Sequence, residues 1–362
     1  MNLRLNLNGR TFTTSELLEI DSEIGKTEFE RSTLAFCKQW LNGKQTFKLT
    51  TSGSTGTPKE IQITRSQMES SARLTIAALG LKVGTTSLVC LDTKYIAGKM
   101  MLVRSLINGM NMVAIEPNVN PLKNIDLKID FAAFVPYQVE MIMDESFEQL
   151  NQLQCAIVGG AAVSSVLRGK MQSTACRLYA TYGMTETISH IALQKLNGTD
   201  AHDFFLVQPG VKIDLDSRGC LTIQADYLGK ASIVTNDLVE ILSPTTFRWL
   251  GRIDNIINTG GVKVSPEKIE LVFESLLHQR NRSYRFFVTS VPHLQLGQQV
   301  VLIVEGQSFS KEAQQVLLKD ASTLLSKFEI PKRIFFVERF LETATGKVNR
   351  KETMQLIAIG NQ

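Results

Sequence analysis

The chain has 362 residues, of which 43% are hydrophobic and 20% charged, and its formal net charge is +4. This length predicts about two domains, and because the basic residues form no block or aromatic-interleaved stripe, nucleic-acid binding is not indicated. Membrane insertion is not indicated either, since no apolar stretch approaches the roughly 20 residues that span a bilayer and the start of the chain lacks the apolar run of a signal peptide. The five cysteines are widely spaced without a CxxC pair, which favours reduced core thiols in a cytoplasmic protein.

A hydroxyl-rich string from Thr50 to Lys59 is suited to gripping phosphate. Glycines let backbone N–H groups converge on an anion, Ser and Thr hydroxyls add donors, and a lysine supplies a mobile positive charge. The string is not a Walker A loop, because Gly53 and Gly56 are too close together and Glu60 follows the lysine directly.

The first half of the chain predicts strands and helices in alternation. A capping box that begins at Ser66 should open a helix that stops at Gly80, and apolar runs bounded by glycine or proline mark the strands. Strands that alternate with helices imply a mostly parallel sheet covered by helices. The expected strands are 1–7, 46–50, 60–64, 87–91, 112–115, 131–135, 155–158 and 178–181, and the expected helices are 66–79, 97–108, 137–143 and 163–171.

The pattern changes in the second half of the chain. Residues 207–241 are strand-rich, and we place a domain boundary near Arg252 to Asp254. Beyond it, about a hundred residues predict a small α+β domain. Its expected elements are helices 266–277 and 311–327, and strands 285–291, 300–305 and 333–337.

Two strings end buried strands, at the sheet edge where open α/β sheets bind ligands. Residues 158–162 contain a glycine pair that could form one wall of an adenine slot, although a tight strand-to-helix turn explains it equally well. In the next string, Tyr182 could stack on adenine, Thr185 could donate to an α-phosphate, and Glu186 could hold Mg²⁺ as a hard oxygen ligand. A further carboxylate, Asp237, could accept hydrogen bonds from ribose hydroxyls.

These strings resemble those of the adenylate-forming enzymes, the superfamily of acyl-CoA synthetases, adenylation domains and luciferases. Residues 50–59 resemble its phosphate loop and residues 182–186 its Tyr-Gly-x-Thr-Glu motif. Asn236 stands where the family usually has glycine, before Asp237, but asparagine tolerates the left-handed backbone that a glycine would adopt. The resemblance implies a nucleotide site made of Thr51, Ser52, Gly53, Ser54, Thr55, Gly56, Thr57, Lys59, Gly160, Ala161, Tyr182, Gly183, Thr185, Asp237 and Arg252.

Two further strings resemble the moving parts of these enzymes. Residues 249–267 resemble the domain junction, in which Arg252 would reach the ribose and Asp254 would be the pivot between two domain orientations. Residues 343–350 resemble the closing motif, whose lysine, here Lys347, catalyses adenylation. A cation at the α-phosphate would stabilise the charge that develops at phosphorus. The resemblance implies that the catalytic residues are Lys347, Thr185 and Glu186.

The resemblance runs from Leu49 to Arg350 and implies an α/β fold. Domain 1–252, with mostly parallel helix-covered sheets, would bind ATP and the acid, and a small mobile α+β domain, 253–362, would carry the catalytic lysine. Only 48 residues precede Leu49, whereas common members have a large extra subdomain there, so we expect the large domain to be truncated at its N-terminus. The implied reaction joins a carboxylic acid to coenzyme A, the co-substrate, through an acyl-adenylate, with ATP and Mg²⁺.

Within the superfamily the chain looks most like short bacterial 2-succinylbenzoate–CoA ligases of menaquinone synthesis. This closer resemblance rests on the sequence pattern of residues 95–106 and 182–193. Lys99, with Lys94 or Arg104, would neutralise the second carboxylate of a dianionic acid; the alternative is that Lys99 snorkels to solvent. The substrate residues expected on this basis are Tyr95, Lys99 and His190.

Two other functions stay open at this point. An adenylating enzyme could load a carrier protein instead of coenzyme A, and a catalytically dead relative could bind nucleotide only. Glu186, Arg252 and Lys347 together argue against the second. The family often forms dimers, so a homodimer is possible, but the sequence shows no decisive interface stripe.

Overall fold

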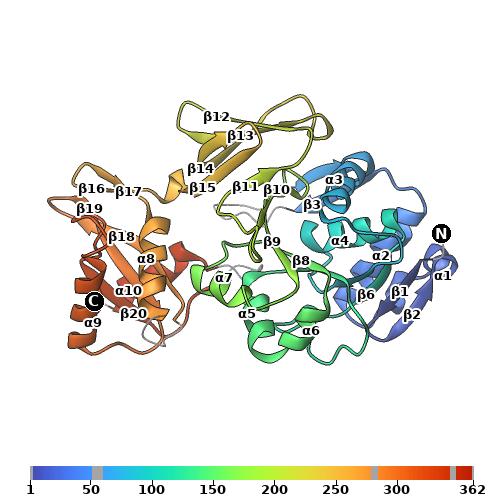
Figure 1. The fold of residues 1–362 in the computed structure, drawn as a ribbon, viewed down its shortest axis with the longest axis horizontal. Coiled ribbons are helices and arrows are strands. Elements are labelled where there is room, and N and C mark those ends of the chain that lie inside the picture. Colours follow the sequence, from blue (N-terminus) through green and yellow to red (C-terminus); the bar gives the residue numbers. More distant parts are fainter. Residues whose placement is uncertain (1–2, 51–59, 279–283, 343–347, 361–362) are drawn as a thin grey trace.

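The computed structural model describes residues 3–50, 60–278, 284–342 and 348–360. Within these ranges thirteen strands form one sheet, in the order β12-β13-β14-β15-β11-β10-β9-β8-β7-β5-β6-β1-β2 (Figure 1). Strands β1 and β5 to β9 pair in parallel, and β10 to β15 pair antiparallel, so the expected α/β class is confirmed. The strands are β1 (Arg4–Leu7), β2 (Arg10–Thr13), β5 (Thr86–Val89), β6 (Asn111–Ala114), β7 (Phe131–Phe134), β8 (Cys155–Val158), β9 (Arg177–Gly183), β10 (His190–Lys195), β11 (Phe205–Val207), β12 (Val211–Leu215), β13 (Cys220–Ala225), β14 (Ile233–Ser243) and β15 (Thr246–Arg252).

Helices cover both faces of the parallel half, because its strands are apolar on both sides. Strands β7 and β8 are buried at every position. One hydrophobic core joins the sheet to α2, α3 and α4, and another joins its opposite face to α5, α6 and α7. These helices and the short α1 are α1 (Thr14–Glu19), α2 (Glu28–Leu41), α3 (Arg65–Leu79), α4 (Ile96–Asn108), α5 (Pro136–Glu145), α6 (Phe147–Gln152) and α7 (Ser165–Met171).

A separate hairpin, β3 (Thr46–Thr50) with β4 (Glu60–Thr64), flanks the hydroxyl-rich string. All five cysteines are free and buried, as expected for core thiols. Among the helices in the described ranges, none is long and apolar enough to cross a bilayer.

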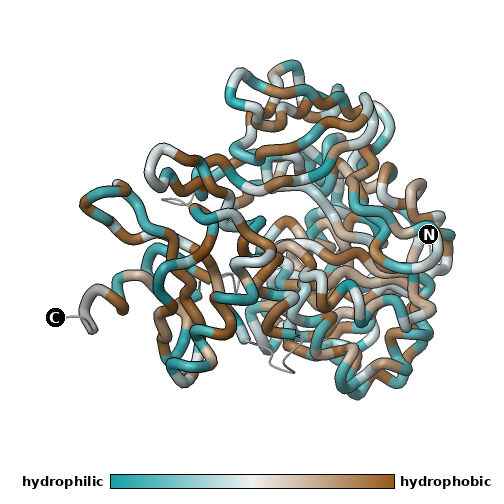
Figure 2. The backbone as a smooth tube through the Cα atoms, turned by 60° about the vertical axis from the view of Figure 1, so that its left-hand side comes forward, coloured by the Kyte–Doolittle hydropathy of each residue, from teal (hydrophilic) through white to brown (hydrophobic). Residues whose placement is uncertain are grey.

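The chain beyond β15 builds a second, smaller sheet, in the order β17-β16-β19-β18 with β20 beside β19. Helices α8 and α9 pack on one of its faces and α10 on the other, which confirms the predicted small α+β unit. Figure 2 shows that hydrophobic residues run through both units. Its elements are β16 (Ile257–Thr259), β17 (Val262–Val264), α8 (Pro266–His278), β18 (Phe286–His293), β19 (Gly297–Glu305), α9 (Lys311–Ala321), β20 (Arg333–Val337) and α10 (Arg350–Gly360).

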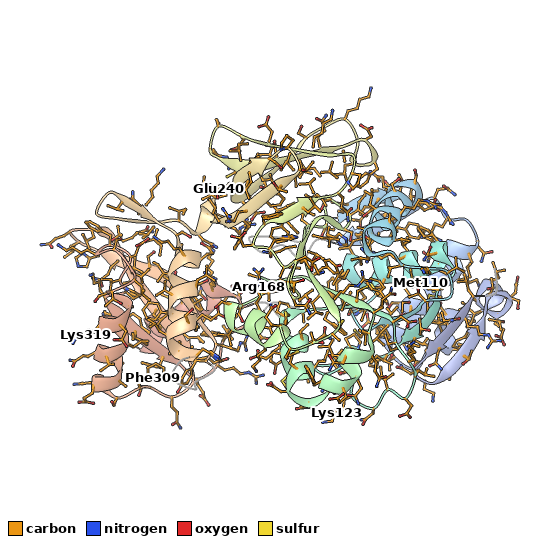
Figure 3. The ribbon with its side chains drawn as sticks, in the orientation of Figure 1. Met110, Lys123, Arg168, Glu240, Phe309 and Lys319 are labelled. Atoms are coloured by element: carbon orange, nitrogen blue, oxygen red, sulfur yellow. The ribbon has the colours of Figure 1, made fainter. Side chains whose placement is uncertain are left out.

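The two units meet where α7 approaches α8. In Figure 3, Arg168 marks α7, and Phe309 and Lys319 mark the smaller unit. The backbone N–H and the hydroxyl of Ser165 donate to one carboxylate oxygen of Glu274, at 3.1 and 3.2 Å. The division between 252 and 253, and the mobility of the smaller unit, stay predictions.

Several expected helix ends differ from the structure: α4 begins at Ile96, α5 spans Pro136–Glu145 and α7 begins at Ser165. Polar side chains explain two further differences. Helix α3 begins at Arg65, because the Thr64 hydroxyl and the Gln67 side chain form the capping box, which the sequence predicts two residues later, at Ser66. The helix expected over 311–327 ends at Ala321. Its next two residues turn their hydroxyls back to the carbonyls of the last turn, at 2.6 and 2.7 Å, and so end the helix.

Glycine is required within α4, which gives a stability prediction. A Cβ at Gly98 would lie 2.4 Å from the carbonyl oxygen of Asp92, which is backbone and cannot move aside. We expect Gly98→Ala to lower the free energy of unfolding by roughly 1–3 kcal/mol. Gly169→Ala is the matched control, because its Cβ meets nothing within 4 Å in α7, and it should be neutral or stabilising by up to about 1 kcal/mol. Urea unfolding of both variants decides; equal stabilities would contradict the prediction.

Candidate active site

The carboxyl ends of β8 and β9 lie side by side, because the strands pair in parallel up to Val158 with Ala180. This brings the glycine pair after β8 next to the Tyr182–Glu186 string after β9. Gly160 and Ala161 are exposed at this edge. The close approach of the two strands explains a glycine at 159, since a Cβ there would lie 2.3 Å from the Thr181 hydroxyl. The role of this pair as an adenine wall stays a proposal.

A tight turn between β9 and β10 carries the predicted metal and phosphate residues. A Cβ at Gly183 would lie 2.4 Å from the carbonyl oxygen of Ser189, and the Thr187 hydroxyl donates to that same carbonyl at 2.7 Å. Ile188 is buried at a φ of 70°, which is an outlier for a β-branched residue. Such a conformation costs of order 1–3 kcal/mol and clusters at functional sites. Sequence reasoning missed this strained residue.

The same turn leaves Glu186 exposed and Thr185 half-buried at the sheet edge. Within the described ranges no group of three or more His, Cys, Asp or Glu side chains could hold a metal by themselves. A single exposed carboxylate suits Mg²⁺, which usually keeps waters and shares its remaining ligands with substrate phosphates. The residues present therefore fit a magnesium ion that arrives with a nucleotide.

Tyr182 and Asp237, expected to contact different parts of a nucleotide, bind each other. The Tyr182 hydroxyl donates to Asp237 at 2.7 Å, and the Trp249 indole N–H donates to the other carboxylate oxygen at 3.3 Å. The Tyr182 ring is buried, edge to face with Phe247. Burial, and then the charge of Asp237, raise the pKa of Tyr182. Stacking on adenine and ribose binding stay proposals for these two residues.

Arg252 forms a two-pronged ion pair with Asp254, at 2.9 and 2.8 Å. Its guanidinium also lies 3.6 Å from Asp237. Burial opposes ionisation of Asp254, but the hydrogen bond and charge of Arg252 outweigh it and lower the pKa of Asp254. The Asn236 amide lies 3.5 Å from the same carboxylate. The predicted ribose ligand and the predicted pivot are thus joined in this structure.

The interior of the large unit holds an unusual buried guanidinium, Arg104. This side chain on α4 is 2% exposed, and it donates to the Ser189 hydroxyl at 2.6 Å. In the described part of the chain its Nε–H has no hydrogen-bond partner, and no carboxylate there forms an ion pair with it. Burial lowers the pKa of Arg104 to about 9, so the group is still charged at neutral pH. A buried charge without a counterion is costly, and this one faces the strained turn.

His190, an expected substrate residue, lies beside Arg104. It is 4% exposed, and its Nε2 lies 3.1 Å from the Thr75 hydroxyl on α3. Burial, followed by the positive charge of Arg104, lowers the pKa of His190 well below its usual range. Its imidazole is therefore neutral in this structure.

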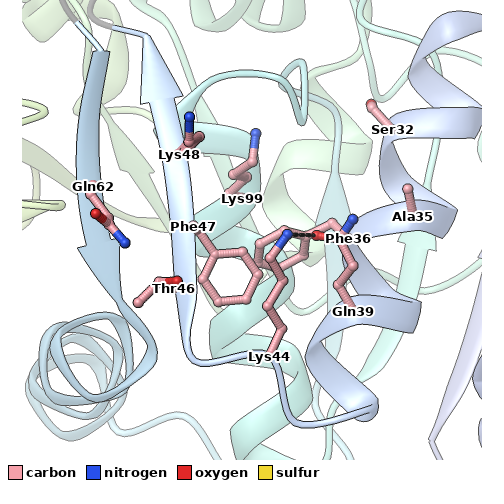
Figure 4. A pocket seen from close by; sticks show the side chains of 10 residues that line it. All are labelled: Ser32, Ala35, Phe36, Gln39, Lys44, Thr46, Phe47, Lys48, Gln62 and Lys99. Carbon is pink, nitrogen blue, oxygen red and sulfur yellow. Dashed lines mark hydrogen bonds between the residues drawn. The ribbon is translucent and has the colours of Figure 1, made fainter.

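Lys99 lies on the same helix as Arg104 but contacts different elements. Its ammonium donates to the carbonyls of Thr93 and Lys94, at 2.7 and 2.6 Å, and burial lowers the pKa of Lys99 to about 8. Lys99 lines a cavity of about 360 Å³, together with Lys48 and Phe47. Figure 4 shows these side chains between α2 and the β3–β4 hairpin.

The other expected substrate residues near Lys99 have different positions. Lys94 is paired with Glu28. Tyr95 is the half-buried residue that precedes α4. The structure thus brings His190 to Arg104 and leaves Lys99 in a separate cavity.

Several expected site residues lie outside the described residues. They are Thr51, Ser52, Gly53, Ser54, Thr55, Gly56, Thr57 and Lys59 of the hydroxyl-rich string, and Lys347. Their roles stay predictions.

Comparisons of sequence identify relatives of this chain. A family model described as AMP-binding enzyme matches residues 42–209. A 2-succinylbenzoate–CoA ligase of Lactococcus lactis is 25% identical over 84% of this chain and 69% of its own length. Another of Salmonella typhimurium is 24% identical over 91% of this chain and 73% of its own length.

Solved structures share the fold. An acyl-CoA synthetase (AMP-forming)/AMP-acid ligase II-like protein from Dyadobacter fermentans is 37% identical, with a TM-score of 0.63, over 95% of this chain and 98% of that protein. The O-succinylbenzoate coenzyme A synthetase of Bacillus subtilis, in complex with ATP and magnesium ion, is 20% identical with a TM-score of 0.71, over 85% of this chain and 69% of that one.

Proposed function

This chain belongs to the family of AMP-binding, adenylate-forming enzymes and is an acid–thiol ligase, and from this premise we propose that its acid is 2-succinylbenzoate and its thiol coenzyme A. The names of the curated relatives support this choice. The product would be the CoA thioester that menaquinone synthesis requires, made in the cytoplasm, where ATP and coenzyme A are available.

The observation that carries the proposal is the buried guanidinium of Arg104, which has no counterion among the described residues. An acid with a single carboxylate loses that charge when it is adenylated, so it has no use for a permanent cation deep in the protein. A second carboxylate would accept from the free Nε–H of Arg104 and supply the missing counterion, and a planar guanidinium suits a carboxylate well. The Ser189 hydroxyl, already bound to Arg104, would add a further polar contact.

The proposed reaction has two steps. A carboxylate oxygen of the acid attacks the α-phosphorus of ATP, the bond to the β-phosphate breaks, and pyrophosphate leaves. The thiol of coenzyme A then loses its proton and attacks the acyl carbon, and AMP leaves with the electron pair of the broken acyl–oxygen bond.

Different residues would serve the two steps. Lys59 and the hydroxyls of 51–57 would hold the departing phosphates, Lys347 would stabilise charge on the transferring phosphoryl group, and Asp237 would hold the ribose. Glu186 would hold Mg²⁺, which supplies charge neutralisation on the phosphates when it is bound.

The test is production of AMP and thioester from ATP, Mg²⁺ and coenzyme A with each of three acids: 2-succinylbenzoate, benzoate and a medium-chain fatty acid. We expect turnover of 2-succinylbenzoate alone. Adenylate without thioester would indicate a carrier protein as the acceptor. Turnover of benzoate or the fatty acid in its place would overturn the choice of acid, and no reaction with any acid would favour a nucleotide-binding protein without activity.

The junction between the units gives a prediction on the second step. If the smaller unit turns about Asp254 between the steps, Asp254→Pro should form adenylate at a near-normal rate but make thioester at least about tenfold more slowly, because proline fixes φ at the pivot. Pyrophosphate release and thioester formation, measured separately, give the two rates.

The control is Asp254→Ala, which removes the ion pair with Arg252 without restricting φ. We expect it to retain most of the thioester rate. Equal losses in both steps for the proline variant, or equal effects of the two substitutions, would count against a pivot.

A further inference from the structure

A chain of hydrogen bonds connects Arg104 to helix α3 through the interior of the large unit. Arg104 donates to Ser189 at 2.6 Å, the Ser189 hydroxyl lies 3.5 Å from Nδ1 of His190, and Nε2 of His190 lies 3.1 Å from the Thr75 hydroxyl. Thr75 in turn donates to the carbonyl of Ser71 at 3.3 Å. Arg104, Ser71, Thr75 and His190 are all at most 4% exposed.

One assignment of the protons satisfies each donor and acceptor in this chain of hydrogen bonds. The Thr75 hydroxyl has one proton, and we assign it to the Ser71 carbonyl at 3.3 Å, so that the hydroxyl oxygen accepts from His190. Nε2 of His190 therefore carries the hydrogen, and Nδ1 is a bare acceptor facing Ser189. Arginine can only donate, so the Ser189 oxygen accepts from Arg104 and its own hydrogen is turned away from the guanidinium.

We propose that His190, held as the neutral Nε2–H tautomer by Thr75, is a positioning residue for the carboxylate site at Arg104. A neutral ring at this place matters, because a second positive charge beside a buried guanidinium would repel it. Because Nδ1 of His190 accepts the hydrogen of the Ser189 hydroxyl, that hydrogen points away from Arg104. When an anion binds, Ser189 can give up its long 3.5 Å contact with His190 and donate to the anion instead. Arg104 keeps its position.

Two features of the surroundings support this role. The turn that delivers Ser189 and His190 contains the strained residue Ile188, so their placement is maintained against a cost. The Ser71 hydroxyl, one helical turn before Thr75, is buried without a hydrogen-bond partner in the described part of the chain. This region thus contains more buried polar groups than its own hydrogen bonds satisfy. Such a surplus is expected of a site that binds a polar ligand.

The positioning role rests on the proposed function for the identity of the substrate. The tautomer of His190, however, can be measured without any substrate. In the free protein, ¹⁵N NMR of the imidazole nitrogens reports the tautomer directly. With only four histidines in the chain, the signal of His190 is assigned as the one that disappears in His190→Gln. We expect the neutral Nε2–H form in the wild type across pH 6–8. Thr75→Val, which keeps the shape but removes the acceptor, should abolish the preference for that tautomer.

The kinetic readout separates positioning from general structural damage. We expect Thr75→Val to raise KM for 2-succinylbenzoate by about tenfold, with kcat changed less than about threefold. Its KM for 4-oxo-4-phenylbutanoate, which lacks the ring carboxylate, should be unchanged. Thr75→Ser retains the acceptor and should restore the wild-type values. A damaged fold would affect both acids alike and lower the melting temperature.

The possible failures are distinguishable. If no acid is activated, the proposed function fails, and the tautomer measurement still decides the inference. If 2-succinylbenzoate is activated but Thr75→Val leaves its KM unchanged, or if His190 carries its hydrogen on Nδ1 in the free protein, the positioning role is wrong.

Discussion

Replacing Arg104 with methionine should lower kcat/KM for 2-succinylbenzoate by about 100- to 1,000-fold, equivalent to roughly 3–4 kcal/mol. The reason is that the second carboxylate of the acid would lose the buried guanidinium proposed as its counterion. The same substitution should leave the melting temperature unchanged or raise it, because it removes a buried guanidinium that lacks a counterion among the described residues. Lower activity with equal or higher stability is the pattern expected of a residue kept for its ligand. Steady-state kinetics and thermal unfolding of one preparation measure both.

Two comparisons make this result specific to the carboxylate. The mono-acid 4-oxo-4-phenylbutanoate should be a poor substrate of the wild type, and Arg104→Met should not make it poorer. Arg104→Lys keeps the charge but not the planar fork of donors, so it should fall between the wild type and the methionine variant. Equal losses on both acids, or a marked fall in stability, would mean that Arg104 serves the fold instead of the substrate.

Replacing Lys347 with alanine should lower the rate of adenylation by about 100- to 1,000-fold, the effect of removing one group that stabilises charge in a transition state. The second step does not transfer a phosphoryl group, so the variant should still convert a supplied acyl-adenylate and coenzyme A to thioester within a few-fold of the wild-type rate. Pyrophosphate release measures the first step and thioester formation from synthetic adenylate measures the second.

Lys351→Ala is the matched control, because Lys351 is an exposed lysine four residues further along, on α10. It should leave both steps unchanged. If Lys347→Ala slows both steps equally, the lysine would be structural, and if it slows neither, the resemblance of residues 343–350 to the closing motif would carry no function.

The sequence alone predicted the class of the fold and most of its elements. Apolar runs bounded by glycine and proline are local signals, and β8 and β20 were predicted residue for residue. Helix ends were less predictable where two caps compete within a few residues, as at Thr64 and Ser66, because the choice depends on where strand β4 ends. The motifs are also local, because each consists of neighbouring residues. The strings around Glu186 and Asp254 could therefore be given predicted roles without a structure.

What only the tertiary structure decided is where the two cations of α4 lie. Lys99 and Arg104 are five residues apart on the apolar helix α4, or about 140° around its axis, and nothing local indicates which side faces the interior of the sheet. The fold turns Arg104 toward Ser189 and Lys99 toward α2 and the hairpin. It also joins His190 to Thr75 across 115 residues of sequence. Contacts of that range depend on how α3, α4 and β10 pack together, and no pattern within a single segment encodes them.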